Sequence, residues 1–140
     1  MTTQAEITLK VKARGFHLVT NEIMGALREK SFTLPQTGVL HIFVKHTSCG
    51  LALCENYDPS VRHDMALDFD RLVPQDAPYY RHVLEGSDDM PSHTKSVLAG
   101  VSLTIPIVRG NLGLGTWQGI YLCESRDNGG PRKLVITAFG

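Results

Sequence analysis

Short runs in which apolar and polar residues alternate dominate this chain, and they limit the folds that it can adopt. The clearest run is residues 39–46 (VLHIFVKH), in which Leu40, Ile42 and Val44 share one face. Alternation with a period of two is typical of a half-buried strand, because successive side chains of a strand point to opposite faces. Comparable runs predict further strands at residues 5–12, 15–20, 51–56, 101–108, 116–124 and 132–139. The sequence therefore predicts a fold built mainly from strands.

Runs that follow one another closely along the chain indicate how these strands pair. We expect one hairpin between residues 5–12 and 15–20, and a second between residues 39–46 and 51–56. Two strands joined by a short turn commonly form an antiparallel pair. Mainly antiparallel sheets are therefore predicted.

Helical signals are fewer, and the strongest is Asp58-Pro59, because Asp is a favoured N-cap and Pro suits the first turn of a helix. The apolar stripe that follows consists of Val61, Met65, Phe69, Leu72 and Val73. Shorter helices are expected after Thr20, as N-cap, and at residues 92–98, with a long polar loop at residues 75–91. The predicted class is α+β: a mainly antiparallel β-sandwich or helix-covered sheet with two or three helices, in a single domain spanning residues 1–140.

Composition excludes several kinds of protein. Fourteen Lys and Arg balance fourteen Asp and Glu among 140 residues, so the chain lacks the basic surplus that a general nucleic-acid binder needs. No apolar run approaches the roughly 20 residues that cross a bilayer, and the N-terminal residues do not resemble a signal peptide. Three cysteines without CxxC spacing predict free thiols. We expect a cytoplasmic protein that binds neither nucleic acid nor membrane.

Three histidines occupy polar, turn-rich segments and are candidate metal ligands: His46 in KHTSCG, His82 in YYRHVLEG and His93 in DDMPSHTK. Imidazole is the commonest metal ligand in proteins, and catalytic zinc typically takes three protein ligands and one open position. The alternative is three unrelated surface histidines, because no local spacing links them. A zinc site formed by His46, His82 and His93 is the sharper hypothesis.

Acidic and basic residues in the same segments suggest chemistry on a phosphorylated compound. Asp88-Asp89 would suit magnesium on a pyrophosphate, although a solvated turn explains the pair equally well. Glu55 is a candidate acid or base, and Lys95 is a candidate phosphate contact near the start of a helix. The glycine-rich residues 110–119 lack the pattern of a dinucleotide site and predict a hairpin.

Four segments in this order and spacing resemble the YjbQ-like family: RGFHLVT (14–20), HTSCGLALCENYDPSVRHDM (46–65), EGSDDMPSHTKS (85–96) and GTWQGIYLCE (115–124). Members of this family are known as secondary thiamine-phosphate synthase enzymes. The resemblance implies a small α+β sandwich that forms a homotrimer. The family's polar motif positions fall on His46, Thr47, Ser48, Glu55, Asn56, Asp58, Arg62, Asp64, His82, Asp88, Asp89, His93, Lys95, Trp117, Gln118 and Glu124. Departures at Cys49 and Cys54 place thiols beside His46.

The resemblance implies a weak or secondary activity that joins hydroxymethylpyrimidine pyrophosphate to thiazole phosphate and releases pyrophosphate. In this hypothesis the catalytic residues are Asp89, Lys95, Glu55 and Glu124, and the substrate-binding residues are Thr47, Ser48, Asn56, Asp88, Trp117 and Gln118. Two alternatives stay open: a metal-dependent hydrolase or lyase that acts on another phosphorylated metabolite, with Glu55 or Glu124 as base, and a non-enzymatic trimeric protein that binds a metal or a ligand.

Overall fold

Eight strands and three helices make up the chain, whose computed structural model describes all residues from 1 to 140. In chain order they are β1 (Thr2–Leu9), β2 (Gly15–Leu18), α1 (Thr20–Glu29), β3 (Thr37–Val44), β4 (Cys49–Glu55), α2 (Pro59–Leu72), α3 (Asp89–Ala99), β5 (Ser102–Val108), β6 (Asn111–Leu112), β7 (Gln118–Glu124) and β8 (Arg132–Phe139). The predicted α+β class is confirmed, and each predicted strand corresponds to an observed one.

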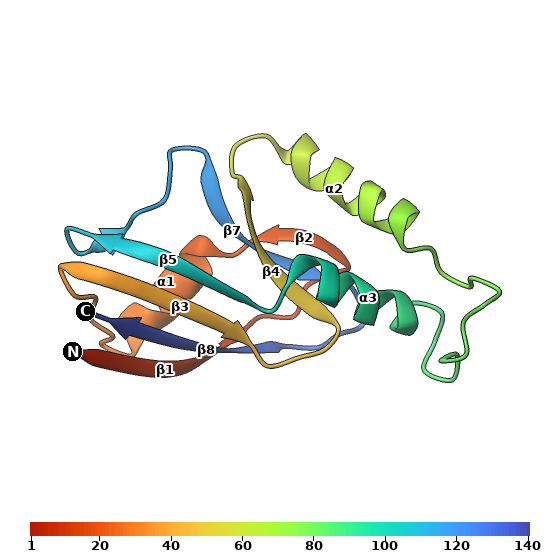
Figure 1. Ribbon diagram of the computed structural model, residues 1–140, viewed down its shortest axis with the longest axis horizontal. Helices are drawn as coiled ribbons and strands as arrows, with labels where there is room; N and C mark the ends of the chain where they lie inside the picture. The colour runs from red at the N-terminus through yellow and green to blue at the C-terminus, as the bar shows by residue number, and fades with distance from the viewer.

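The strands form two antiparallel sheets that lie in separate layers (Figure 1). A five-stranded sheet has the order β1-β8-β3-β5-β6, and a three-stranded sheet has the order β2-β7-β4. Every pairing between neighbouring strands is antiparallel, as the sequence predicts. The molecule is therefore a two-layer sandwich of unequal sheets.

The hydrophobic core lies between the two sheets. Leu40, Ile42 and Val44, the predicted inner face of β3, are almost wholly buried there. Leu51 of β4 meets them from the smaller sheet, and Ile23 of α1 closes one side. Burying a side chain of this size contributes about 1.5–3 kcal/mol. The alternating pattern thus determines which face of each strand is covered.

Both predicted hairpins are wrong. β1 pairs with β8 and β2 pairs with β7, whereas β3 and β4 belong to different sheets. In each case the short connection carries the chain from one layer to the other. Alternation specifies the buried face of a strand but not its neighbour, so closeness in sequence misled the prediction.

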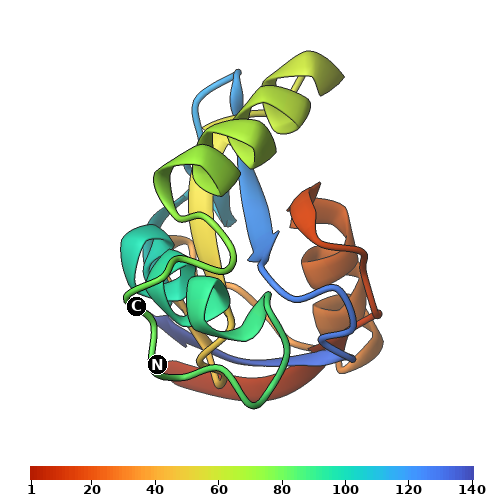
Figure 2. The ribbon, with the colours of Figure 1, turned by 90° about the vertical axis from the view of Figure 1, so that its right-hand side faces the viewer.

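The helices lie on different parts of the sandwich, as the turned view shows (Figure 2). α1 contacts β1 and β7, while α2 lies against β2 and α3 against β4. Asp58 caps α2 as predicted, since its Oδ1 accepts a hydrogen bond of 2.9 Å from the Ser60 N–H. Thr20 is instead the first residue of α1, and its hydroxyl accepts a hydrogen bond from the Ile120 N–H. None of the three helices combines the length and the apolar composition that a membrane-spanning helix needs.

A glycine on β4 allows α3 to pack directly on the smaller sheet. A Cβ added at Gly50 would lie 2.7 Å from both the Ala99 Cβ and the Gly100 carbonyl oxygen, which is too close for any larger residue. The Leu51 N–H donates to that same carbonyl at 2.9 Å. The C-terminal end of α3 is therefore held against β4, which fixes the position of the side chains that α3 carries.

Candidate metal centre

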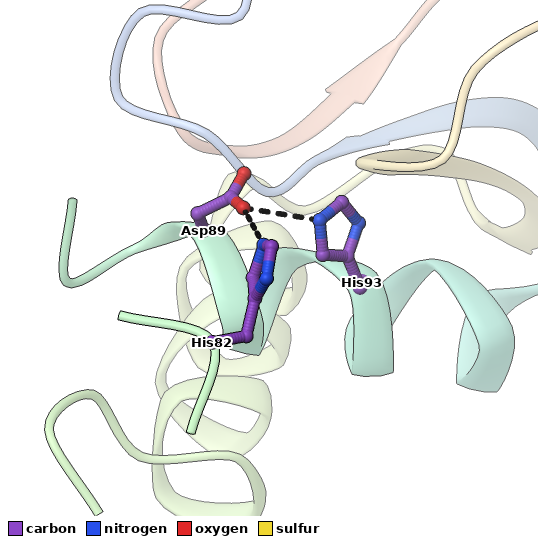
Figure 3. Close-up of side chains that lie close together, drawn as sticks. All are labelled: His82, Asp89 and His93. Atoms are coloured by element: carbon purple, nitrogen blue, oxygen red, sulfur yellow. Dashed lines mark hydrogen bonds and ion pairs between the residues drawn. The ribbon is translucent and has the colours of Figure 1, made fainter. Parts of the chain in front are cut away.

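Three side chains converge beside the N-terminal half of α3: His82, Asp89 and His93 (Figure 3). Asp89 Oδ2 lies 2.6 Å from His82 Nε2 and 3.1 Å from His93 Nε2. One ligand atom from each residue lies within 4.8 Å of the other two. This is the size of cluster that one metal ion spans, because metal–ligand distances are about 2.0–2.2 Å.

Local structure explains how the three side chains meet. Asp89 and His93 are four residues apart on α3, so they project from the same face of the helix. His82 comes from the segment between α2 and α3, which contains no helix or strand; the loop predicted for residues 75–91 ends earlier, because residues 89–91 belong to α3. Its side chain is half exposed, whereas the Asp89 side chain is 6% exposed. The cluster therefore has a buried carboxylate and an accessible imidazole.

The hydrogen bonds of His93 determine which of its ring nitrogens is free. Nδ1 lies 2.8 Å from the Thr47 carbonyl oxygen, which can only accept, so Nδ1 carries a proton. In a neutral ring the lone pair of Nε2 then faces the Asp89 carboxylate at 3.1 Å. Two acceptors in contact need a cation or a second ring proton between them. The contact between His93 and the Thr47 carbonyl is also the arrangement that commonly orients a metal-ligating histidine.

Asp89 is ionised at neutral pH. Burial alone would raise its pKa, but the hydrogen bond from His82 and the charges of His93 and Arg126 together hold that pKa below its ordinary value. Arg126 donates to Asp89 Oδ1 through Nη1 and to Asp88 Oδ2 through Nε, the latter at 2.9 Å. One guanidinium therefore binds both members of the Asp88-Asp89 pair and leaves Asp89 Oδ2 facing the imidazoles.

His46 lies outside this cluster, although it was predicted to be a ligand. Its Nε2 accepts a hydrogen bond of 2.8 Å from the Lys133 N–H. Burial, reinforced by the charge of Arg132, lowers the pKa of His46 below its ordinary value. His46 and His93 both line a groove of about 450 Å³, together with Thr47, Ser96, Val97 and Val101. The structure thus brings two of the three predicted histidines together and adds Asp89.

The predicted catalytic residues other than Asp89 are engaged elsewhere. The buried Lys95 donates to Asp70 Oδ1 at 2.6 Å. The buried Glu124 binds Arg132 through both carboxylate oxygens, at 2.7 and 2.6 Å. Glu55 accepts backbone N–H groups at the end of β4, one of them from Asp58 at 3.1 Å. None of the three belongs to the histidine–aspartate cluster.

The predicted substrate-binding residues fall into two groups. Thr47, Ser48 and Asp88 lie near the cluster: the Ser48 hydroxyl accepts from Arg132 at 2.9 Å, and Thr47 and Asp88 make the contacts given above. Asn56 and Gln118 line a separate polar cavity of about 350 Å³, and Trp117 lies nearby with its ring centroid 5.7 Å from that of Tyr57. The two groups lie at opposite ends of β4.

Sequence reasoning did not predict that arginines bind the acidic residues, above all that Arg132 binds Glu124. It also missed the spacing of Asp89 and His93. A carboxylate and an imidazole at positions i and i+4 are predicted to share a helix face, but only if the helix includes Asp89. The sequence predicts that this helix begins at residue 92, whereas α3 begins at Asp89. Pro91 falls in the first turn, where its missing N–H leaves no hydrogen bond unmade.

Fold and site together define a two-layer antiparallel sandwich with a candidate metal centre of two histidines and one aspartate. The chain belongs to the family described as UPF0047 protein YjbQ-like, whose family model matches residues 5–140. It is 52% identical over 139 residues to the UPF0047 protein YjbQ of Salmonella typhimurium, an alignment that covers 98% of this chain and 97% of the relative.

Comparison with solved structures supports the same family assignment. An uncharacterised YjbQ/UPF0047 family protein from Clostridium acetobutylicum is 34% identical, has a TM-score of 0.81, and is matched over 96% of this chain and 99% of its own. A protein of unknown function from Sulfolobus solfataricus has a TM-score of 0.84 over 100% of this chain and 98% of its own, but at 20% identity it supports the fold alone. The names of these relatives state no activity, so the family does not support the predicted thiamine-phosphate synthase label.

Proposed function

We propose that the chain is a metal-dependent enzyme that acts on a small phosphorylated metabolite, with the metal held by His82, Asp89 and His93. One observation carries this proposal: the Nε2 atoms of His82 and His93 lie 2.6 and 3.1 Å from the same oxygen, Oδ2 of the buried Asp89. A divalent cation among these three atoms would replace the ring protons and accept a coordinate bond from each residue. His82 completes the set from the solvent-exposed side.

The donor atoms favour zinc over magnesium. Two imidazoles and one carboxylate are a common ligand set of catalytic zinc, and they leave a position open for water or substrate. Magnesium prefers oxygen ligands in an octahedron, and this cluster offers it one carboxylate. Magnesium remains the ion that a pyrophosphate substrate would bring with it.

The metal would supply charge stabilisation for a departing phosphate or pyrophosphate group, and it would lower the pKa of a bound water to about 7. The chain's own residues orient the site: Thr47 fixes the ring of His93, and Arg126 fixes Asp89. Hydrolysis would need no base beyond a metal-bound water, which fits the engagement of Glu124 by Arg132. The resemblance adds a second candidate, the joining of hydroxymethylpyrimidine pyrophosphate to thiazole phosphate.

Metal analysis of variants tests the site. We expect one zinc per chain in the wild type and a loss of affinity of about 100-fold or more in His82→Ala, His93→Ala and Asp89→Asn, because each change removes a ligand or its charge. His41→Ala is the control, since His41 lies on β3 away from the cluster. His46→Ala distinguishes the predicted three-histidine site, which loses metal, from the cluster of Figure 3, which keeps it. Equal metal content in all variants contradicts the proposal.

An activity assay separates the candidate reactions. Release of phosphate or pyrophosphate is measured with a panel of phosphorylated metabolites and with the pyrimidine and thiazole substrates, before and after removal of metal by a chelator. In both candidate reactions Asp89→Asn should reduce turnover by orders of magnitude while the fold persists. Activity that is unchanged in this variant would show that the Asp88-Asp89 pair has a purely structural role.

We also propose that the chain assembles as a homotrimer, as the resemblance implies. The outer face of the five-stranded sheet supports this, because it exposes the large apolar residues Phe43, Val108 and Phe139. Closed symmetric assembly is a common way to cover such a face. Light scattering should return three times the chain mass, and Phe43→Glu should lower it. A monomer mass at micromolar concentration contradicts the trimer.

A further inference from the structure

A second polar cavity, apart from the histidine–aspartate cluster, lies between α2, α3 and the smaller sheet. Its volume is about 100 Å³, and its polar lining includes Arg14, Asp70, Lys95, Glu124 and Ser125. A buried water needs roughly 10–15 Å³ of such volume, so the cavity has room for a small ion in place of several waters.

Lys95 is the most unusual residue of this cavity. Its side chain is 5% exposed, and its ammonium makes one hydrogen bond, to Asp70 Oδ1 at 2.6 Å. An ammonium has three N–H donors, so two of them remain free. A buried charge with free donors is costly unless a partner binds it. Lys95 is therefore arranged to bind an acceptor inside the cavity.

Ser125 and Arg14 provide further donors on other walls. Ser125 is 4% exposed, and its hydroxyl has no hydrogen-bond partner within the chain. Arg14 donates from Nε to Asp127 and from Nη1 to Asp70, which leaves its Nη2 donors free. The three residues come from separate segments: α3, the residue before β2, and the residue after β7. Donors that converge from three directions suit an acceptor with several oxygens.

The acidic residues that line the cavity repel a bound anion less than their number suggests, because basic side chains bind them. Both oxygens of Glu124 are bound by the buried Arg132, so the charge of Glu124 is compensated. Asp70 shares a single oxygen between Arg14 and Lys95. The remaining wall is apolar and includes Phe16 and Phe69. Their rings pack edge to face, with centroids 4.9 Å apart. Such a wall excludes water and strengthens hydrogen bonds to a bound ion.

A chain of charged contacts connects the cavity to the candidate metal centre. Arg14 binds Asp127, the Asp127 N–H donates to Asp88 at 3.0 Å, and Asp88 shares Arg126 with Asp89. A molecule that reaches both places would have its reacting group at the metal and an anionic group in the cavity.

We propose that this cavity binds a tetrahedral oxyanion, the phosphate group of the enzyme's substrate, through Lys95, Ser125 and Arg14. The assignment to the substrate rests on the proposed function, whereas the binding of an oxyanion does not. Inorganic phosphate is therefore the probe, and titration calorimetry is the measurement.

Wild-type protein should bind inorganic phosphate in the millimolar range or more tightly. Lys95→Met should weaken this binding about tenfold or more, and Ser125→Ala, which removes one hydroxyl, about fivefold. Lys45→Met is the matched control, because it removes the same charge from an exposed lysine that pairs with Glu6. It should bind phosphate as the wild type does. Should Lys95→Met fail to fold, Ser125→Ala decides the question.

No binding by the wild type, unchanged binding in Ser125→Ala, or equal weakening in Lys45→Met overturns the inference. His82→Ala separates it from the proposed function, because this variant should lose metal but still bind phosphate. Loss of phosphate binding in His82→Ala places the ion at the metal instead and also overturns the inference. Competition between inorganic phosphate and the substrate in the turnover assay distinguishes a substrate phosphate from free phosphate, and absence of competition overturns the assignment to the substrate.

Discussion

The two ends of the three-stranded sheet differ sharply in how deeply their side chains are buried. At one end, where Cys49 of β4 pairs with Glu124 of β7, five charged residues are buried: Asp88, Asp89, Lys95, Glu124 and Arg132. At the other end, where Glu55 pairs with Gln118, Tyr57 and Trp117 are 75% and 60% exposed. The seven residues of β4 separate these ends by about 20 Å.

This difference indicates where function lies. Removing charged groups from water is expensive, and paired buried charges are often no more stable than apolar residues of the same size. A fold that nevertheless buries five charges at one end keeps them for a reason other than stability, and clusters of this kind are typical of functional sites. The residues of the exposed end, by contrast, are free to bind or to vary without such a cost.

The largest expected effect is at the buried end. Arg132→Met leaves the carboxylate of Glu124 buried without its bidentate partner, and removing one member of a buried ion pair destabilises a protein by about 3–5 kcal/mol. Unfolding in urea measures this loss. Lys45→Met breaks the exposed pair with Glu6 and should leave the unfolding free energy unchanged within error. Equal stability of the two variants would contradict the claim that the buried charges differ from exposed ones in their effect on stability. The double variant Arg132→Met/Glu124→Leu should recover much of the loss, because no unpaired charge remains.

How far the sequence predicts this molecule depends on the range of the interactions involved. Alternation in β3 identifies its buried face, and Asp58-Pro59 identifies the start of α2, because both are local effects. The partners of each strand follow instead from packing between layers. A short connection such as the one between β3 and β4 serves equally well as a hairpin turn or as a crossing to the other sheet.

The same distinction applies to the candidate site. Asp89 and His93 were identified separately, and their shared helix face was missed because the helix was predicted to begin at residue 92, after Asp89. The approach of His82 depends on the path of a loop without periodicity, and that of Arg126 on a contact across 37 residues. Neither has a local signal. Residue types that suit a metal site are visible in the sequence, whereas their convergence is a property of the fold.

A smaller effect is expected at His46, which lies in the connection from β3 to β4, near the buried end. The pKa of His46 is lowered in the folded state, so the unfolded chain binds the proton more readily. The stabilisation is complete above the unfolded pKa of about 6.5 and is lost as the pH falls through the lower folded pKa. Protonation breaks the hydrogen bond from the Lys133 N–H, a loss of about 1 kcal/mol.

Urea unfolding at a series of pH values from 7 to 5 measures this dependence. The unfolding free energy of the wild type should decrease across that range, and His46→Gln should flatten the curve, because its amide does not titrate. His41→Gln, on the outer face of β3, is the control and should keep the slope of the wild type. A slope that survives in His46→Gln assigns the pH dependence to another group.

The smallest effect on stability is expected at the exposed end, at Trp117. Replacing a buried tryptophan with alanine commonly costs about 3–5 kcal/mol, but Trp117 is 60% exposed and its aromatic contact is with Tyr57, which is itself exposed. Trp117→Ala should therefore change the unfolding free energy by about 0.5 kcal/mol, as for an ordinary surface residue. If Trp117 binds substrate, as the resemblance implies, the same variant should raise KM while metal content and phosphate binding stay unchanged. A loss of several kcal/mol instead would show that this end is covered in solution, and would remove the contrast on which the assignment of function to the opposite end depends.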